Sequence, residues 1–238
     1  MKVQIGKYKN KRVLAVVAHP DDLEFYAAGT ISILSRSSRV HLAVVTNGEN
    51  GGSMGKEKLK ALRRREQRKA AKVLGIKEVV LLNFRDTQVV NVPNLRRRLV
   101  EVIIVFKPEM LITFDPANEH ELHPDHRNLG QAVIDSLIAV DVRGWKVGEV
   151  LLFNTLRPNV FVDVSSVWNL VMDSNRAHKS QFSEFNGGWE EKRRILEEKA
   201  AILGSKRGAK YAEAFRRIDL SSRTYITQAN ESIREEFD

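Results

Sequence analysis

Short apolar segments alternate with longer stretches of mixed polarity along the first two thirds of the chain, and this alternation restricts the fold more than any other feature. The apolar segments have the length of buried strands and comprise residues 13–18, 40–46, 79–83, 110–114 and 150–153. The stretches between them favour helices over residues 21–36, 56–72, 94–106 and 124–140. Strands that are apolar throughout and are joined through helices are typical of parallel sheets covered on both faces. The sequence therefore predicts an α/β fold with a mostly parallel sheet flanked by helices.

The last third of the chain has a different pattern. After a short apolar segment at residues 161–164, helices are predicted over residues 165–181, 189–203 and 210–217. We interpret this region as a helical C-terminal cap over about residues 165–238. Because no repeat, low-complexity segment or linker interrupts the chain, residues 1–238 are expected to form a single domain.

The composition excludes several classes of protein. With 42% hydrophobic and 29% charged residues, the 238-residue chain has the composition of a soluble globular protein and not of a disordered one. No apolar segment approaches the ~20 residues that span a bilayer. Residues 1–8 contain no apolar signal core, so a cytoplasmic location is expected. The chain has no cysteine, so any metal must be bound by nitrogen and oxygen atoms.

The net charge of +9 raises an alternative function. Much of the positive charge lies in residues 56–72 and 96–98, and basic surfaces bind nucleic-acid phosphates. A charged helix face is more often only solvated, and no aromatic side chains lie among these residues to stack on bases. We therefore expect no nucleic-acid partner, and a basic nucleic-acid-binding module with a structural metal site is kept as the alternative.

The tripeptide His-Pro-Asp occurs twice, each time after a predicted strand. Residues 19–22 (His-Pro-Asp-Asp) follow the first strand, and residues 123–126 (His-Pro-Asp-His) follow the fourth strand after a short loop. Proline suits the first position of a helix, so both histidines are expected at helix N-termini. These N-termini would lie on the carboxyl edge of the sheet, where open α/β folds bind ligands.

The two motifs bring together residue types that can hold a catalytic divalent metal. His19 and Asp22, like His123 and His126, are three residues apart, so each pair shares one side of a first helical turn. Two imidazoles and one carboxylate around a divalent metal leave an open position for water, as in catalytic zinc sites. Asp21 is rotated by ~100° from Asp22 on a helix, which makes it the natural general base. His123 is then the natural partner for a developing oxyanion.

These residue types also have structural interpretations. The acidic residues of both motifs could have the purely structural role of complementing the positive ends of helix dipoles. His120 is near enough to compete as a ligand, but it precedes the helix and has no paired residue. His41, within a predicted strand, and His178, on a late helix, are interpreted as structural.

The basic helix over residues 56–72 has one unusual charge. Glu66 falls on the apolar face of this helix, and Arg63 precedes it by three residues. The two residues could form a partly buried ion pair. Alternatively, Glu66 could hold Arg63 toward a ligand, and the spacing favours neither arrangement.

Several motifs of the chain resemble those of the LmbE-like, or PIG-L, family of zinc-dependent N-acetylglucosaminyl deacetylases. The two metal motifs, within residues 18–24 and 123–126, carry the most specific resemblance. Weaker matches are Ala28-Gly29-Thr30, where the family usually shows two glycines, residues 46–49, Arg63 with Glu66, residues 178–181 and residues 212–215. The resemblance spans nearly the whole chain in the expected order.

The resemblance implies a Rossmann-like fold and a metal-dependent hydrolase that removes the N-acetyl group from a GlcNAc conjugate or chitooligosaccharide, with release of acetate and a free amine. By position, it implies that His19, Asp22 and His126 bind Zn²⁺ or another divalent metal. It implies that Asp21 is the base, that His123 stabilises the oxyanion, and that Asp125 orients His123. Arg63 and Asp86 match positions that contact sugar hydroxyls. A homo-oligomer, a trimer or hexamer, is expected by the same resemblance, whereas the aglycone of the acetamido-sugar substrate stays open among inositol, malate, phosphatidylinositol and a second GlcNAc.

Overall fold

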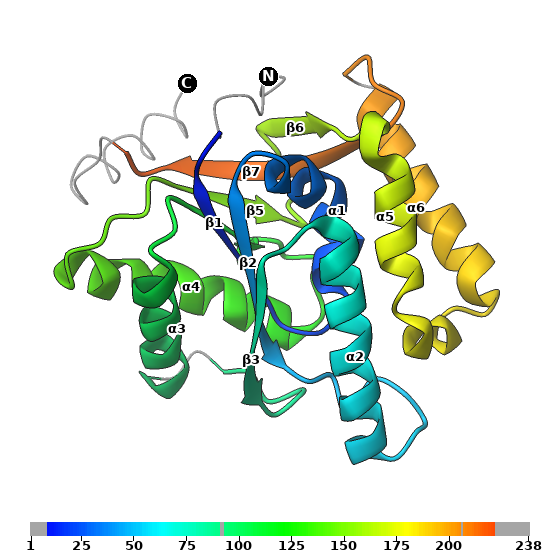
Figure 1. Cartoon of the computed structure of the whole chain (residues 1–238), viewed down its shortest axis with the longest axis horizontal. Helices are drawn as coiled ribbons and strands as arrows, with labels where there is room; N and C mark the ends of the chain where they lie inside the picture. Colours follow the sequence, from blue (N-terminus) through cyan, green and yellow to red (C-terminus); the bar gives the residue numbers. More distant parts are fainter. Residues whose placement is uncertain (1–8, 91–92, 206, 222–238) are drawn as a thin grey trace.

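The computed structural model describes residues 9–90, 93–205 and 207–221, and in these residues one seven-stranded sheet forms the centre of the molecule (Figure 1). The strands are β1 (Arg12–Val17), β2 (Arg39–Thr46), β3 (Glu78–Phe84), β4 (Met110–Phe114), β5 (Glu149–Phe153), β6 (Val160–Asp163) and β7 (Ala212–Asp219). Their order is β3-β2-β1-β4-β5-β7-β6. The strands from β3 to β5 in this order pair in parallel, and β7 pairs antiparallel with both β5 and β6. The predicted α/β fold with a mostly parallel sheet is confirmed.

Helices cover both faces of this sheet. They are α1 (Asp22–Ser35), α2 (Lys56–Leu74), α3 (Pro93–Phe106), α4 (Pro124–Val142), α5 (Trp168–Arg176) and α6 (Gly188–Ser205), with 3₁₀ turns η2 (Ser165–Val167) and η3 (Lys179–Glu184). Figure 1 shows α3 and α4 against one face and α1 and α2 against the other. Helix α5 packs on α1 and α2, and α6 packs on β7 and η3. Within the described residues, no helix is both long and apolar enough to cross a membrane.

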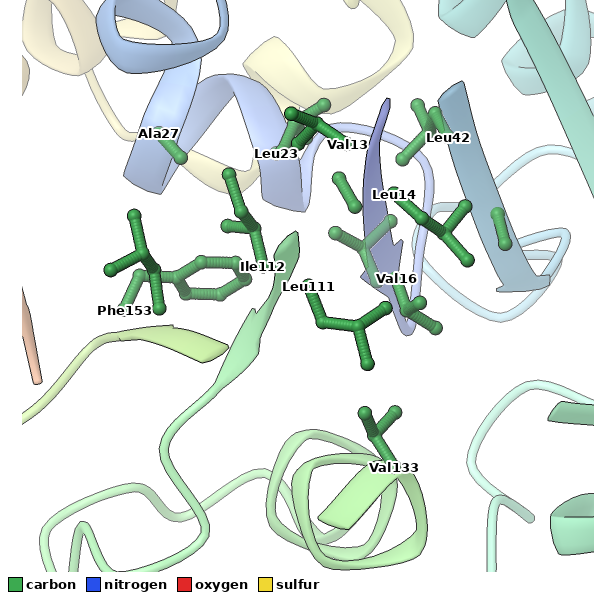
Figure 2. Close-up of a cluster of buried hydrophobic side chains, with 14 of the residues drawn as sticks. Val13, Leu14, Val16, Leu23, Ala27, Leu42, Leu111, Ile112, Val133 and Phe153 are labelled. Atoms are coloured by element: carbon green, nitrogen blue, oxygen red, sulfur yellow. The ribbon is translucent and has the colours of Figure 1, made fainter. Parts of the chain in front are cut away.

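The central strands form the hydrophobic core. The side chains of β1 between Val13 and Val17 are fully buried, and so are Leu111 and Ile112 of β4. Figure 2 shows how these side chains meet Leu23 of α1 on one face and Val133 of α4 on the other. A strand packed on both faces must be apolar throughout, which explains the continuous apolar runs in the sequence.

The strand order places the carboxyl ends of β1 and β4 side by side. The chain winds from β1 toward β2 and β3 on one side and continues from β4 toward β5 on the other. Such a reversal opens a crevice at the carboxyl edge of a parallel sheet. The loops that carry the two His-Pro-Asp motifs follow β1 and β4, so both enter this crevice.

The helical prediction for residues 210–217 is wrong, because the chain forms strand β7 there. Alanine, glutamate and arginine are good helix formers, but helix propensity is a small energetic preference that tertiary pairing overrides. Strand β7 hydrogen-bonds with β5 on one side and β6 on the other, so its backbone groups are satisfied within the sheet. The prediction for residues 165–181 also changes, since 3₁₀ turns flank a shorter helix α5. The C-terminal cap is therefore helical only up to Ser205 among the described residues, and residues 222–238 lie outside them.

Strand β7 is fastened to α1 through the side chain of Glu213. Its two carboxylate oxygens accept hydrogen bonds from the backbone N–H of Gly29 at 2.7 Å and of Thr30 at 2.8 Å. A Cβ atom at position 29 would lie 2.5 Å from Cβ of Val164, much closer than carbon atoms can approach. Glycine is therefore required at position 29 by the close approach of β6 and β7 to α1.

Candidate active site

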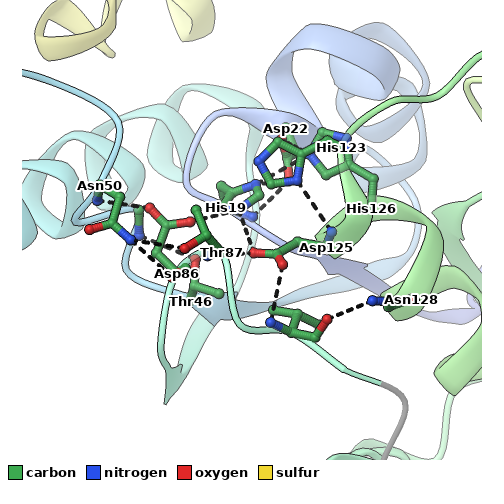
Figure 3. Close-up of polar contacts among 12 residues, drawn as sticks. His19, Asp22, Thr46, Asn50, Asp86, Thr87, His123, Asp125, His126 and Asn128 are labelled. Carbon is green, nitrogen blue, oxygen red and sulfur yellow. Dashed lines mark hydrogen bonds and ion pairs between the residues drawn. The ribbon is translucent and has the colours of Figure 1, made fainter.

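His19, Asp22 and His126 converge at the carboxyl edge of the sheet, although the first two follow β1 and the third belongs to α4 (Figure 3). Nδ1 of His19 lies 3.2 Å from Nε2 of His126. The carboxylate oxygens of Asp22 lie 3.3 Å from Nε2 of His126 and 3.5 Å from Nδ1 of His19. The three side chains thus form a triangle around a common centre, in which each imidazole faces a different carboxylate oxygen of Asp22.

The size of this triangle fits a tetrahedral divalent metal. Bonds of ~2.0–2.1 Å in tetrahedral geometry place the ligand atoms roughly 3.3–3.4 Å apart. All three distances lie within about 0.2 Å of that spacing. Two imidazoles and a carboxylate are also the nitrogen and oxygen ligands that zinc accepts in catalytic sites. His19, Asp22 and His126 therefore fit the metal that the sequence predicts.

The outer nitrogen of each imidazole contacts a carboxylate. Nδ1 of His126 lies 3.1 Å from Oε2 of Glu121. Nε2 of His19 lies 3.1 Å from Oδ1 of Asp86 and 3.2 Å from Oδ2 of Asp125. Carboxylates in this position fix the tautomer and the orientation of metal-binding histidines. They leave Nδ1 of His19 and Nε2 of His126 directed at the common centre.

His123 lies beside this centre as the N-cap residue of α4. Its Nδ1 accepts a hydrogen bond from the backbone N–H of Asp125 at 3.2 Å, so the proton of the neutral ring is on Nε2. Burial, together with the charges of His19 and His126, lowers the pKa of His123. The ring is thereby suited to donate a hydrogen bond as a neutral group.

Asp125 differs from the role that the resemblance implies. Only its backbone N–H contacts His123. Its carboxylate contacts His19 and accepts hydrogen bonds from the backbone N–H of Thr87 and Val89, at 2.8 and 3.1 Å. Asp125 thus orients a predicted metal ligand and reaches His123 only through the backbone.

Asp21 stands in an unusual backbone conformation, with φ at 94°. Such left-handed geometry is strained for a residue with a side chain and is found most often at functional sites. Three side chains hold it there. Gln67 accepts from the backbone N–H of Asp21 at 3.0 Å, and Nη2 of Arg63 lies 3.1 Å from Oδ1. Nζ of Lys192 lies 4.0 Å from the other carboxylate oxygen, Oδ2.

The contacts of Arg63 and Glu66 differ from both arrangements considered for them. The guanidinium of Arg63 donates to the carbonyl oxygens of Gly48 and Pro20, at 2.9 and 2.6 Å, besides its contact with Asp21. Glu66 instead accepts from the backbone N–H and the hydroxyl of Ser180, at 2.9 and 2.6 Å. Glu66 therefore fastens η3 to α2, and Arg63 is held by backbone oxygens and not by a carboxylate on its own helix.

A pocket of about 320 Å³ opens onto these residues. Its lining includes the predicted residues His19, Asp21, Asp22, Arg63, Asp86 and His123. Asp86 is buried, and its carboxylate accepts from the backbone N–H of Asn50 at 2.8 Å while it faces His19. Burial acts to raise the pKa of Asp86, but the hydrogen bond and charge of His19 outweigh it, so the pKa is lowered. Asp86 thus lines the pocket with an ionised carboxylate.

Sequence reasoning missed part of this pocket. Phe25, Tyr26, Phe185 and Lys192 line it as well, and the last two come from the C-terminal segment. Lys192 is only 1% exposed although it lies in a helix rich in surface charges. No local pattern distinguishes it from its exposed neighbours on α6, because its burial depends on how α6 packs over the site.

The other histidines lie away from the pocket. His120 is exposed, so it is not a competing ligand. His41 stacks on Phe106, with ring centroids 4.4 Å apart. His178 is fully buried, with Nε2 3.3 Å from Glu24, and Gln67 donates to the same glutamate at 2.8 Å. His178 and Glu24 thus help to fix the side chain of Gln67, which in turn contacts the backbone of Asp21.

Comparison with known proteins shows which family the chain resembles in sequence. The sequence model of the PIG-L family, described as GlcNAc-PI de-N-acetylase, matches residues 14–137. The diacetylchitobiose deacetylase of Thermococcus kodakarensis is 30% identical over 222 residues, which cover 87% of this chain and 82% of that protein. A Bacillus cereus protein named "Probable N-acetyl-alpha-D-glucosaminyl L-malate deacetylase 2" is 30% identical, with 72% and 84% covered.

The fold is likewise similar to a solved structure. The N,N'-diacetylchitobiose deacetylase from Pyrococcus horikoshii, solved with an inhibitor, superimposes with a TM-score of 0.83 and 29% identity. The match covers 95% of this chain and 91% of that one. Since the family model matches more than half of the chain and the relatives agree in sequence and fold, the chain belongs to the PIG-L (LmbE-like) family of deacetylases.

Proposed function

We propose that this protein is a zinc-dependent deacetylase that hydrolyses the acetamide of a GlcNAc-containing substrate to acetate and a free amine. The observation that carries this proposal is the triangle of His19, Asp22 and His126, with Asp21 and His123 beside it and not part of it. The names of the relatives, which are deacetylases of diacetylchitobiose and of GlcNAc–malate, support the same substrate class.

His19, Asp22 and His126 would hold the metal, which when bound supplies Lewis acidity for the attacking water and the amide carbonyl. Asp21 accepts a proton from the water while the oxygen of that water attacks the acetyl carbon. Nε2–H of His123 donates to the carbonyl oxygen as negative charge develops there. The carbon–nitrogen bond then breaks, acetate is released, and Asp21 returns its proton to the leaving amine.

The contacts of Arg63 support a second task besides the one that the resemblance implies. Its guanidinium is engaged with two carbonyl oxygens and with Asp21, so its first effect is to fix the base. Asp86 faces both the pocket and His19, so it would bind sugar hydroxyls while it orients a metal ligand. We propose that both residues bind substrate from these fixed positions.

The basic nucleic-acid-binding alternative explains less. The deacetylase relatives do not support it, and the pocket holds a paired base and oxyanion donor that a structural metal site does not need. Assembly into a homo-oligomer and a cytoplasmic location stay predictions from the sequence.

Amine release from GlcNAc conjugates tests this function. Diacetylchitobiose, GlcNAc–malate and GlcNAc–inositol would be incubated with the purified chain, and the free amine would be detected by a fluorogenic reagent. At least one conjugate should yield amine, a chelator should abolish the reaction, and Zn²⁺ should restore it. Salt-sensitive nucleic-acid binding that ignores chelator, with no amine from any conjugate, would favour the alternative.

A further inference from the structure

A second cavity, of about 460 Å³, lies between α1, α5, α6 and β7. Its lining is mostly apolar and includes Tyr26, Trp168, Val171, Leu196 and Leu203. Its size falls within the range of pockets that bind small molecules. Protein interiors are otherwise closely packed, so an apolar space of this size beside a catalytic pocket points to a ligand.

This cavity adjoins the metal-site pocket. Phe25 and Tyr26 line both spaces. Asn154, which lines only the second cavity, donates to Glu121 at 2.5 Å, and Glu121 contacts Nδ1 of His126 at 3.1 Å. Phe25 and Tyr26 therefore form the boundary between the two spaces, and a molecule whose sugar occupies the metal-site pocket would extend past these two rings to reach the second cavity.

Lys199 brings a positive charge into the mostly apolar wall, which also contains Glu198 and Glu213. Its Nζ lies 4.2 Å from the ring centroid of Tyr26 and 4.9 Å from that of Phe25. Among the described residues, the ammonium group of Lys199 makes no ion pair, and Glu213 is the carboxylate whose charge acts on it. Burial lowers the pKa of Lys199 to about 8, and the charge of Glu213 only partly opposes that shift.

Glu213 is the nearest candidate partner for Lys199, but its carboxylate is already engaged. Both of its oxygens accept backbone N–H groups of α1, at Gly29 and Thr30. The ammonium group of Lys199 therefore rests on the faces of Phe25 and Tyr26. Lys199 is half-buried, and an anionic ligand group in the cavity would gain a charge-assisted hydrogen bond from its ammonium group.

We propose that the second cavity receives the aglycone of the substrate, and that this aglycone is an apolar group carrying one acidic function that pairs with Lys199. The inference rests on the proposed deacetylation and specifies its substrate class. A polyhydroxylated aglycone fits this space less well, because most of the lining, including Val171, Leu196 and Leu203, offers no hydrogen-bond partner to a hydroxyl.

A matched series of glycosides tests the proposal. Methyl β-GlcNAc would be compared with alkyl β-GlcNAc glycosides of increasing chain length, and each of these with its ω-carboxyalkyl counterpart. With the wild-type chain, kcat/KM should rise with chain length by up to about threefold per buried methylene. The carboxylate should add a further gain of about tenfold once the chain is long enough to reach Lys199.

Two variants separate the apolar and the charged parts of the cavity. Leu203→Trp fills the cavity, so it should abolish the dependence on chain length, whereas Ile138→Trp on the exposed side of α4 should keep it. Lys199→Met should remove only the gain from the carboxylate, and Lys72→Met on the surface of α2 should leave that gain unchanged. If kcat/KM of the wild type is independent of chain length, or if Lys199→Met still prefers the acidic glycosides, the proposal is wrong.

Calorimetry of the corresponding free-amine glycosides gives a readout without turnover. Their affinity for the wild-type chain should rise with chain length and fall again in Leu203→Trp. If no GlcNAc glycoside yields amine, the proposed deacetylation is wrong. If the affinity of the free-amine glycosides nevertheless rises with chain length and falls in Leu203→Trp, the second cavity still binds the aglycone. If amine is released but neither affinity nor kcat/KM depends on the chain, the cavity proposal alone fails.

Discussion

The guanidinium of Arg63, on α2, lies 3.1 Å from the carboxylate of Asp21, in the loop between β1 and α1. Two backbone carbonyl oxygens hold the same guanidinium in place. Arg63 comes from α2 and is 4% exposed, so this contact joins two elements and is shielded from solvent. It gives the proposed base a fixed direction, which a flexible aspartate at a helix start would lack.

Replacing Arg63 should therefore impair catalysis more than metal binding. Arg63→Ala is expected to lower kcat/KM by about 10²-fold, since small misplacements of a catalytic group cost that much. Metal content should be unchanged, because Arg63 contacts none of the three predicted ligands. Arg65→Ala, on the exposed side of the same helix, is the control. Unchanged kinetics together with a lower Tm would show that Arg63 is only structural.

Asp21 and its neighbour Asp22 should separate base chemistry from metal binding. Asp21→Asn is expected to keep its metal and to lose ~10²–10⁴-fold in kcat, the usual contribution of a general base. Asp22→Asn should lose metal instead, because its carboxylate faces both imidazoles. Steady-state kinetics and metal analysis of the two variants measure this. Normal turnover by Asp21→Asn would contradict the assignment of the base.

The metal should also contribute to thermal stability. A ligand that binds only the folded state raises its stability, by about 2.7 kcal/mol at a hundred times its Kd. A chelator should therefore lower the Tm of the wild-type chain, and Zn²⁺ should restore it. His126→Ala should no longer respond to chelator, whereas His120→Ala, whose side chain is exposed and outside the site, should respond like wild type. An equal response in both variants would place the metal elsewhere.

Gly29 should be intolerant of a side chain for steric reasons. Gly29→Ala places a Cβ atom 2.5 Å from Val164, and overpacking of this kind costs about 1–3 kcal/mol of unfolding free energy. Gly55→Ala is a matched control, because its Cβ meets no atom within 4 Å and its φ is −54°. Chemical denaturation of both variants tests this. Equal stability of the two would mean that β6 and α1 can separate at little cost.

The sequence predicted those features that depend on local pattern. Strands β1 to β5 are short apolar runs, and the two His-Pro-Asp motifs combine a helix start with metal-binding residue types. Both signals are contained in a few consecutive residues, so the fold class and the candidate ligand set could be predicted.

The features that were missed depend on contacts between distant segments. Strand β7 has helix-favouring residues, and only its pairing with β5 and β6 makes it a strand. The burial of Lys192 follows from the packing of α6. Arg63 finds Asp21 because the loop after β1 passes α2, and helix spacing alone pointed to Glu66 instead. None of these partners lies within ten residues along the chain.

The most direct test of the account is an anomalous-scattering measurement at the zinc edge on crystals grown with Zn²⁺. One strong peak is expected at ~2.0–2.2 Å from Nδ1 of His19, Nε2 of His126 and a carboxylate oxygen of Asp22. The peak should be lost in His126→Ala and kept in Asp21→Asn. A wild-type crystal with no peak at these three atoms, or with its zinc bound elsewhere, would contradict the account.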